Sequence, residues 1–141
     1  MPQSLKPVVV PGAPKPVGPY SSAVIVGDLV FVSGQSGRDP ITDFVSEDVE
    51  VQTEVCLNNV RIILEAAGTT LSRVVRCGVF LVEMKDFQKM NGVYARTFGD
   101  HRPARTTVAV SELPGPGLKV EIDVVALVGV KSRSDPEREV L

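Results

Sequence analysis

Apolar residues along this chain fall into short runs that predict β-strands. Residues 23–26 and 29–33 are two such runs on either side of Gly27-Asp28, a two-residue turn of the kind that closes a hairpin. Residues 74–82 are rich in β-branched side chains and predict a buried strand. A short strand is expected over 106–110, and a longer one over 118–128, after the Pro-Gly turn at 114–117.

Two other segments repeat an apolar residue at the spacing of a helix, which predicts two amphipathic helices. Ser46 is the expected N-cap of the first helix, with the acidic Glu47 and Asp48 behind it, and Gly68 is expected to end this helix. Asp86 is the expected cap of the second helix. The apolar stripe of the first comprises Val49, Cys56, Val60, Ile63 and Ala67, and that of the second comprises Phe87, Met90, Tyr94 and Phe98.

A hairpin followed by helices that alternate with strands favours an α+β fold, a mixed sheet with two helices packed on one face. We expect this domain to span residues 18–130. Residues 1–17 are rich in proline, and we expect an extended arm without regular elements. Residues 131–141 are polar and broken by Pro136, which predicts a frayed C-terminal tail.

The last strand is apolar on both faces from Val124 to Val130, apart from Gly129. Helices on one side of the sheet leave its other side to be covered by something else. A second copy of the same chain is the simplest cover, so the pattern predicts a closed homo-oligomer.

Composition narrows the classes of function. The formal net charge is −2 and aromatic residues make up 5% of the chain, which disfavours binding to a phosphate backbone or to stacked bases. One histidine and two separated cysteines, Cys56 and Cys77, give no zinc pattern, so no metal is expected. The first residues lack the features of a secretory signal, and no apolar run approaches the roughly 20 residues that span a bilayer. We therefore expect a cytoplasmic protein.

Candidate chemistry lies in the last third of the chain. Arg105 precedes a strand, and its planar guanidinium suits two-point binding of a carboxylate. Glu121 and Asp123 share one face of the last strand, where a carboxylate would place a water. The alternative is a surface ion pair for Arg105, to Asp100 or Asp123, and a solvated strand face for the acids. We keep the solvated interpretation for Asp123 alone.

Short motifs follow one another in a fixed order over residues 18–129. They are Gly18-Pro19-Tyr20, Ser33-Gly34-Gln35, Asn58-Asn59-Val60, Glu65-Ala66-Ala67-Gly68, Asn91 with Tyr94, Arg102-Pro103-Ala104-Arg105 and Val120-Glu121-Ile122. In this order and spacing the chain resembles the RidA/YjgF family of imine and enamine deaminases, also labelled L-PSP endoribonucleases.

The resemblance implies a chorismate-mutase-like α+β protomer and a homotrimer with clefts between neighbouring subunits. It implies hydrolysis of reactive 2-imino or 2-enamino acids to 2-keto acids and ammonia, without metal or organic cofactor. Arg105 matches the arginine that holds the substrate carboxylate, and Glu121 matches the glutamate associated with the hydrolytic water. The positions that line the cleft correspond to Tyr20, Ser33, Gly34 and Asn91. The alternative is a tight turn for Ser33-Gly34, a packing aromatic for Tyr20 and an exposed polar residue for Asn91.

One residue departs from the family pattern. Deaminases close to RidA usually carry Cys two residues after the arginine, where this chain has Thr107. A hydroxyl is smaller and forms hydrogen bonds, which would alter the shape of the pocket and its choice of substrate. We therefore include Thr107 among the expected substrate-binding residues.

Two other functions are compatible with parts of the pattern. A noncatalytic trimer that binds small acids or partner proteins would need Arg105 but not Glu121, so the presence of both favours the enzyme. An endoribonuclease, as the older family label suggests, is disfavoured by the acidic balance and by the scarcity of aromatic residues and histidine.

Overall fold

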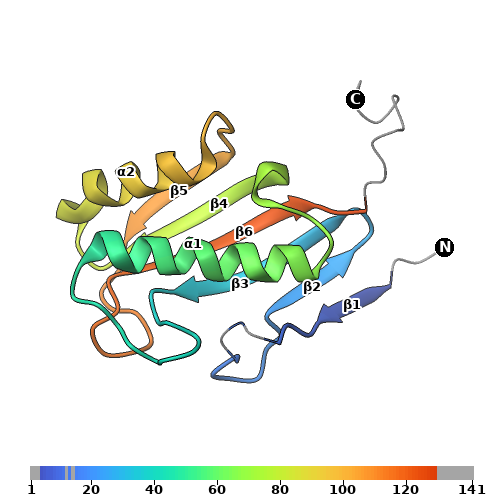
Figure 1. The fold of residues 1–141 in the computed structure, drawn as a ribbon, viewed down its shortest axis with the longest axis horizontal. Coiled ribbons are helices and arrows are strands. Elements are labelled where there is room, and N and C mark those ends of the chain that lie inside the picture. The colour runs from blue at the N-terminus through green and yellow to red at the C-terminus, as the bar shows by residue number, and fades with distance from the viewer. Residues whose placement is uncertain (1–3, 12, 14, 130–141) are drawn as a thin grey trace.

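The computed structural model describes residues 4–11, 13 and 15–129, and these form one six-stranded sheet with two helices. The strand order is β1-β2-β3-β6-β4-β5, and all neighbours are antiparallel except the parallel pair β4–β5. Both helices lie over one face of the sheet (Figure 1). In chain order the elements are β1 Leu5–Val8, β2 Ala23–Val26, β3 Leu29–Ser36, α1 Val49–Ala66, β4 Val74–Leu81, α2 Phe87–Phe98, β5 Ala104–Ala109 and β6 Val120–Leu127.

The apolar stripes of the helices face the sheet, as predicted. Val49, Cys56, Val60 and Ile63 of α1 are buried, and so are Met90, Tyr94 and Phe98 of α2. Ala67 and Phe87, at the ends of the stripes, are partly buried against the same core. Alternate residues of β6 complete this core from the side of the sheet, because successive side chains of a strand point to opposite faces. These are Val120, Ile122, Val124 and Ala126.

The predicted start of α1 is wrong by two residues. The N-cap is Asp48, whose carboxylate accepts a hydrogen bond from the backbone N–H of Glu50 at 2.8 Å. Ser46 instead accepts from the backbone N–H of Asp48 at 3.0 Å, and so orders the turn before the helix. The predicted end is confirmed, since Gly68 follows the C-cap with a φ of +92° that favours glycine. Asp86 is the N-cap residue of α2, but its side chain forms no capping bond within the described chain.

The expectation that residues 1–17 lack regular elements is wrong for Leu5–Val8. This segment is strand β1, which pairs antiparallel with β2 from Leu5↔Val26 to Val8↔Ala23. Pro7 is tolerated because β1 lies at the edge of the sheet, where one side of the strand needs no partner. The predicted C-terminal tail, residues 131–141, lies outside the described residues.

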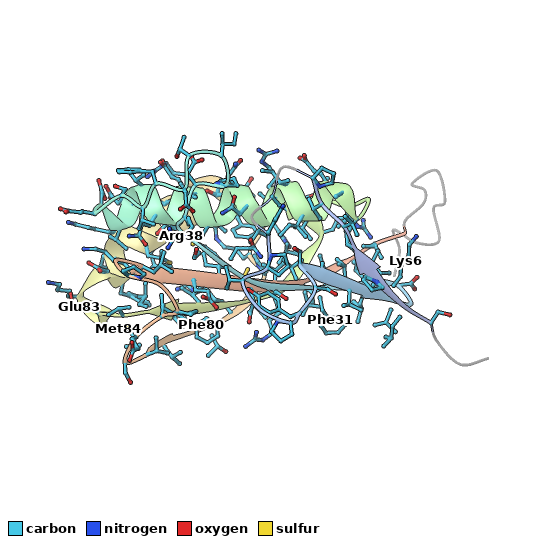
Figure 2. The ribbon with its side chains drawn as sticks, turned by 90° about the horizontal axis from the view of Figure 1, so that it is seen from below. Lys6, Phe31, Arg38, Phe80, Glu83 and Met84 are labelled. Carbon is cyan, nitrogen blue, oxygen red and sulfur yellow. The ribbon has the colours of Figure 1, made fainter. Side chains whose placement is uncertain are left out.

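The face of the sheet opposite the helices carries large apolar side chains, and we call it the open face. Phe31 of β3 and Phe80 of β4 project from it, away from the helices (Figure 2). Phe31 is 45% exposed and Leu127 is 38% exposed. Val125 lies opposite Phe31 on the same face, so β6 is apolar on both faces from Val124 to Val128, as predicted. Val130 lies outside the described residues.

Candidate active site

The two residues predicted to carry the chemistry lie on opposite faces of the sheet. Residues paired across strands point to the same face. Arg105 of β5 is paired with Cys77 of β4, which is fully buried beneath the helices, so Arg105 lies on the helix side. Glu121 of β6 is paired with Phe80, which projects from the open face. One chain therefore does not bring Arg105 and Glu121 together.

Arg105 is held by aromatic rings of α2. Its guanidinium carbon lies 4.7 Å from the centre of the Tyr94 ring and 5.7 Å from that of Phe87. Stacking on rings attracts a cation but leaves the edge of the guanidinium free to donate. Among the described residues no carboxylate lies within ion-pair distance of Arg105, so the predicted alternatives, ion pairs with Asp100 or Asp123, are not formed.

A pocket of about 270 Å³ opens beside this side chain, and we call it the arginine pocket. Its lining residues are Asn91, Tyr94, Ala95, Arg102, Pro103 and Arg105. The side-chain oxygen of Asn91 and the hydroxyl of Tyr94 are buried and have no hydrogen-bond partner within the described chain. Burial raises the pKa of Tyr94, so this hydroxyl stays protonated and available as a donor. A ligand with acceptor and donor groups would satisfy both atoms.

Glu121 lies in a second pocket, of about 260 Å³, which we call the glutamate pocket. Tyr20, Gly34 and Arg38 also line it. Burial raises the pKa of the Glu121 carboxyl, and the negative charge of Asp123 raises it further. A carboxyl group with a raised pKa is a better proton acceptor when ionised, which suits a residue that activates water.

The backbone of β3 gives Glu121 its room. The pairing of β3 with β6 shifts between Val32 and Gln35, a β-irregularity that brings Gly34 against the carboxylate. A Cβ atom at Gly34 would lie 2.2 Å from Oε2 of Glu121, so any side chain there would displace the carboxylate. Glycine at position 34 therefore lets the Glu121 carboxylate keep its place beside β3.

The other predicted site residues differ in how freely they could meet a ligand. Tyr20 is 48% exposed, and its hydroxyl accepts from the backbone N–H of Val17 at 3.3 Å. The hydroxyl of Ser33 donates to the carbonyl of Ser21 at 2.7 Å, so this side chain stabilises the end of the strand.

Thr107 lies on the helix side of β5, opposite Val79 and two residues beyond Arg105. Asp123 is part-buried on the open face, and its carboxylate accepts from the N–H of Gly78 of β4 at 3.0 Å.

Two buried amides of α1, Gln52 and Asn59, were not predicted, and the partners of Asn59 line the glutamate pocket. Gln52 donates to the carbonyls of Ser46 and Gly117 and accepts from the N–H of Lys119, all at 2.7–2.8 Å. Asn59 donates to the carbonyls of Ser36 and Arg38 at 3.3 and 3.2 Å. The helical spacing could have predicted their burial. Gln52 follows the core residue Val49 by three positions, and Asn59 follows the core residue Cys56 by three positions, so both lie on the buried face of α1.

No group of three or more His, Cys, Asp or Glu side chains among the described residues is arranged to hold a metal ion. None of the described helices has the length and apolar character needed to cross a membrane.

A mixed sheet with two helices on one face defines an α+β domain, and it carries two small pockets, one beside Arg105 and one beside Glu121. The family model described as Endoribonuclease L-PSP matches residues 11–128. The chain belongs to this family, the RidA/YjgF family, and the predicted resemblance is confirmed.

Individual relatives agree with this assignment. A RutC family protein of Pyrococcus horikoshii is 48% identical over 115 residues, which cover 81% of this chain and 90% of that protein. The 2-iminobutanoate/2-iminopropanoate deaminase of Salmonella typhimurium is 38% identical over 125 residues, covering 86% of this chain and 97% of that protein. The solved structure of Escherichia coli TdcF with bound serine matches with a TM-score of 0.82 and 35% identity, over 86% of this chain and 98% of that chain. The α+β fold predicted from the sequence is thereby confirmed.

Proposed function

We propose that this protein hydrolyses 2-imino and 2-enamino acids to 2-keto acids and ammonia. The observation that carries the proposal is the guanidinium of Arg105, which has no carboxylate partner among the described residues and lines a small pocket, in a chain related to a deaminase of 2-imino acids over 86% of its length. The TdcF neighbour supports it as well, because its ligand, serine, is a small carboxylic acid. The N–H groups along the edge of a guanidinium can bind the carboxylate that 2-imino acids, 2-enamino acids and serine share.

The proposed reaction is hydrolysis of a C=N bond, and it balances without a cofactor. Water adds to the imine carbon, a C–O bond forms, and the electron pair of the C=N bond moves to nitrogen, which takes up a proton. The C–N bond of the resulting carbinolamine then breaks, ammonia leaves, and the hydroxyl proton is lost as the C=O bond forms. Ionised Glu121 would accept the proton of the attacking water, and Arg105 would fix the substrate carboxylate.

These two roles require a second copy of the chain. Arg105 and Glu121 lie on opposite faces of one sheet, so a single chain cannot present both to one small substrate. The open face, with Phe31 and Phe80, has the apolar character of a surface that another copy would cover. We therefore propose a homotrimer in which the arginine pocket of one subunit meets the glutamate pocket of the next. Tyr20, Gly34, Asn91 and Thr107 would contact the substrate there.

The test is hydrolysis of freshly generated 2-iminopropanoate and 2-iminobutanoate. Each imine is produced by an amino-acid oxidase with catalase present, and semicarbazide is added as a competing trap. The protein should divert the imine from the trap to free 2-keto acid and ammonia, and dialysis against a chelator should leave the rate unchanged. If the imine partitions as it does without the protein, while a 2-keto acid still binds, the chain is a binding module.

The endoribonuclease alternative is tested in the same preparation. His101 is the single histidine of the chain, and its Nε2 lies 2.6 Å from the carbonyl oxygen of Val74, outside both pockets. Cleavage of a labelled single-stranded RNA is expected at the rate of a buffer control. Cleavage that is abolished by Glu121→Gln would instead favour the older family label.

A further inference from the structure

We propose that Arg102 provides a second anion contact in the arginine pocket and that the preferred substrates are 2-imino acids with two acidic groups. The inference rests on the proposed function and narrows its substrate class. It starts from a residue that the candidate chemistry leaves unused, since Arg105 alone is enough for a monocarboxylate.

The composition of the pocket points to a dianion. Arg102 and Arg105 both line it, and its lining contains no Asp or Glu. The four ion pairs among the described residues involve Arg38, Arg61, Lys85 and Arg96, so both pocket arginines lack a carboxylate partner in that part of the chain. Within one subunit these two cations repel each other. A ligand with two negative charges can pair with both, whereas a monoanion that pairs with Arg105 leaves Arg102 without a partner.

Backbone carbonyls hold Arg102 at the rim. Its Nη1 donates to the carbonyl oxygens of Gly99 and His101, at the C-terminal end of α2. These bonds use one nitrogen of the guanidinium and leave Nη2 and Nε, each with N–H groups, for a ligand. Pro103 lies between the two arginines in the sequence, and its fixed φ angle restrains the backbone that joins them.

The remaining groups of the pocket fit the reacting end of the same compound. If Arg105, on the Tyr94 ring, takes the carboxylate next to the imine, the side-chain oxygen of Asn91 is an unpaired acceptor for the imine N–H. The part of the site that one subunit supplies has a volume of about 270 Å³, which favours a short chain between the two acidic groups. A four- or five-carbon dicarboxylic imino acid meets these conditions.

The test compares two imines in the trap-competition assay. 2-Iminopropanoate is made from D-alanine with D-amino-acid oxidase, and 2-iminosuccinate from D-aspartate with D-aspartate oxidase. Arg102→Gln should lower kcat/KM for 2-iminosuccinate by roughly three- to fivefold, the effect of one exposed charged contact, and should leave 2-iminopropanoate within about 1.5-fold. Arg102→Lys should restore part of the loss, because the charge is kept.

The matched control is Arg96→Gln, on an exposed arginine of α2 whose partner is Glu54 at 3.6 Å and which does not line the pocket. This control variant should leave kcat/KM unchanged for both imines. If Arg102→Gln lowers kcat/KM equally for both imines, or for neither, the inference is overturned even when the deaminase activity is present.

A binding measurement separates this inference from the proposed function. In calorimetry, 2-oxoglutarate should bind wild type more tightly than 2-oxobutanoate, and Arg102→Gln should remove the difference. If no imine is hydrolysed, the proposed function fails while this preference, where observed, still supports the two-anion pocket. Equal affinities for the two keto acids in wild type overturn it.

Discussion

Glu121 illustrates at the scale of one residue how a functional group can oppose stability. Its pKa is raised in the fold by burial and by Asp123, so the unfolded chain releases this proton at a lower pH than the native chain does. Stability attributable to Glu121 is therefore lost as pH rises from the ordinary glutamate pKa through the raised value. Above both values the wild-type protein carries the full penalty of a half-buried carboxylate.

Glu121→Gln should consequently raise the free energy of unfolding at pH 7, by less than about 1 kcal/mol because water screens the group in part. The gain should shrink at pH 4, where the wild-type carboxyl is largely protonated. Urea denaturation at both pH values, at one protein concentration, measures this, and the same variant should have lost most of its deaminase turnover. The measured quantity is the difference in free energy of unfolding between Glu121→Gln and wild type. If this difference favours the variant less at pH 7 than at pH 4, the pKa of Glu121 is not raised.

Arg105 is expected to act in binding rather than in stability. Arg105→Ala removes the two-point contact to a carboxylate and should weaken binding of a 2-keto acid by about 2–5 kcal/mol. Arg105→Lys should rescue poorly, because an ammonium lacks both the planar fork and the stacking on Tyr94. Calorimetric titration of 2-oxobutanoate is the measurement, with Arg61→Ala as a control in the exposed i,i+4 ion pair of α1. Wild-type affinity in Arg105→Ala would exclude the carboxylate assignment.

At the scale of elements, Gln52 couples helix α1 to two loops and to the start of β6. Gln52→Leu leaves three backbone groups, on Ser46, Gly117 and Lys119, without their buried partner. We expect a loss of about 2–5 kcal/mol in the free energy of unfolding, since each orphaned group costs roughly 1–3 kcal/mol and water recovers some of them. Gln88→Leu, on the exposed side of α2, is the matched control and should change stability by less than about 0.5 kcal/mol. Equal unfolding curves for the two variants would contradict this role for Gln52.

The elements also show how far the sequence alone could lead. The hairpin over β2 and β3 and the stripe of α1 were predictable, because turn residues and helical spacing are local signals. β1 was not, since Pro7 disfavours a strand and only the free outer side of an edge position makes it acceptable. The cap of α1 was misplaced because Ser46 and Asp48 are both good cap residues, and their spacing alone does not choose between them.

The same distinction applies to the site. Period-two spacing placed Glu121 and Asp123 on one face of β6, and the structure confirms that placement. It could not relate Glu121 to Arg105, because the face of one strand relative to another depends on strand order and register. The two pockets on opposite faces are therefore a finding of the structure.

For the whole molecule, the assembly decides whether the two pockets form one site. Sedimentation equilibrium should give about three times the chain mass of 15.1 kDa. Phe31→Asp places a charge on the open face and should shift the protein toward monomer with loss of activity. A wild-type chain that is monomeric at micromolar concentration would exclude a shared site.

Mixing inactive variants tests the shared site directly. Arg105→Ala keeps an intact Glu121, and Glu121→Gln keeps an intact Arg105, so neither variant alone forms a complete site. If subunits are exchanged at random in a 1:1 mixture after dissociation and reassembly, about one site in four joins the intact arginine of one subunit to the intact glutamate of the next. Deaminase activity should therefore return to roughly a quarter of the wild-type value, and each variant carried through the same treatment alone should stay inactive. A mixture as inactive as its components, after subunit exchange has been verified by mass, would exclude a site shared between Arg105 of one subunit and Glu121 of the next.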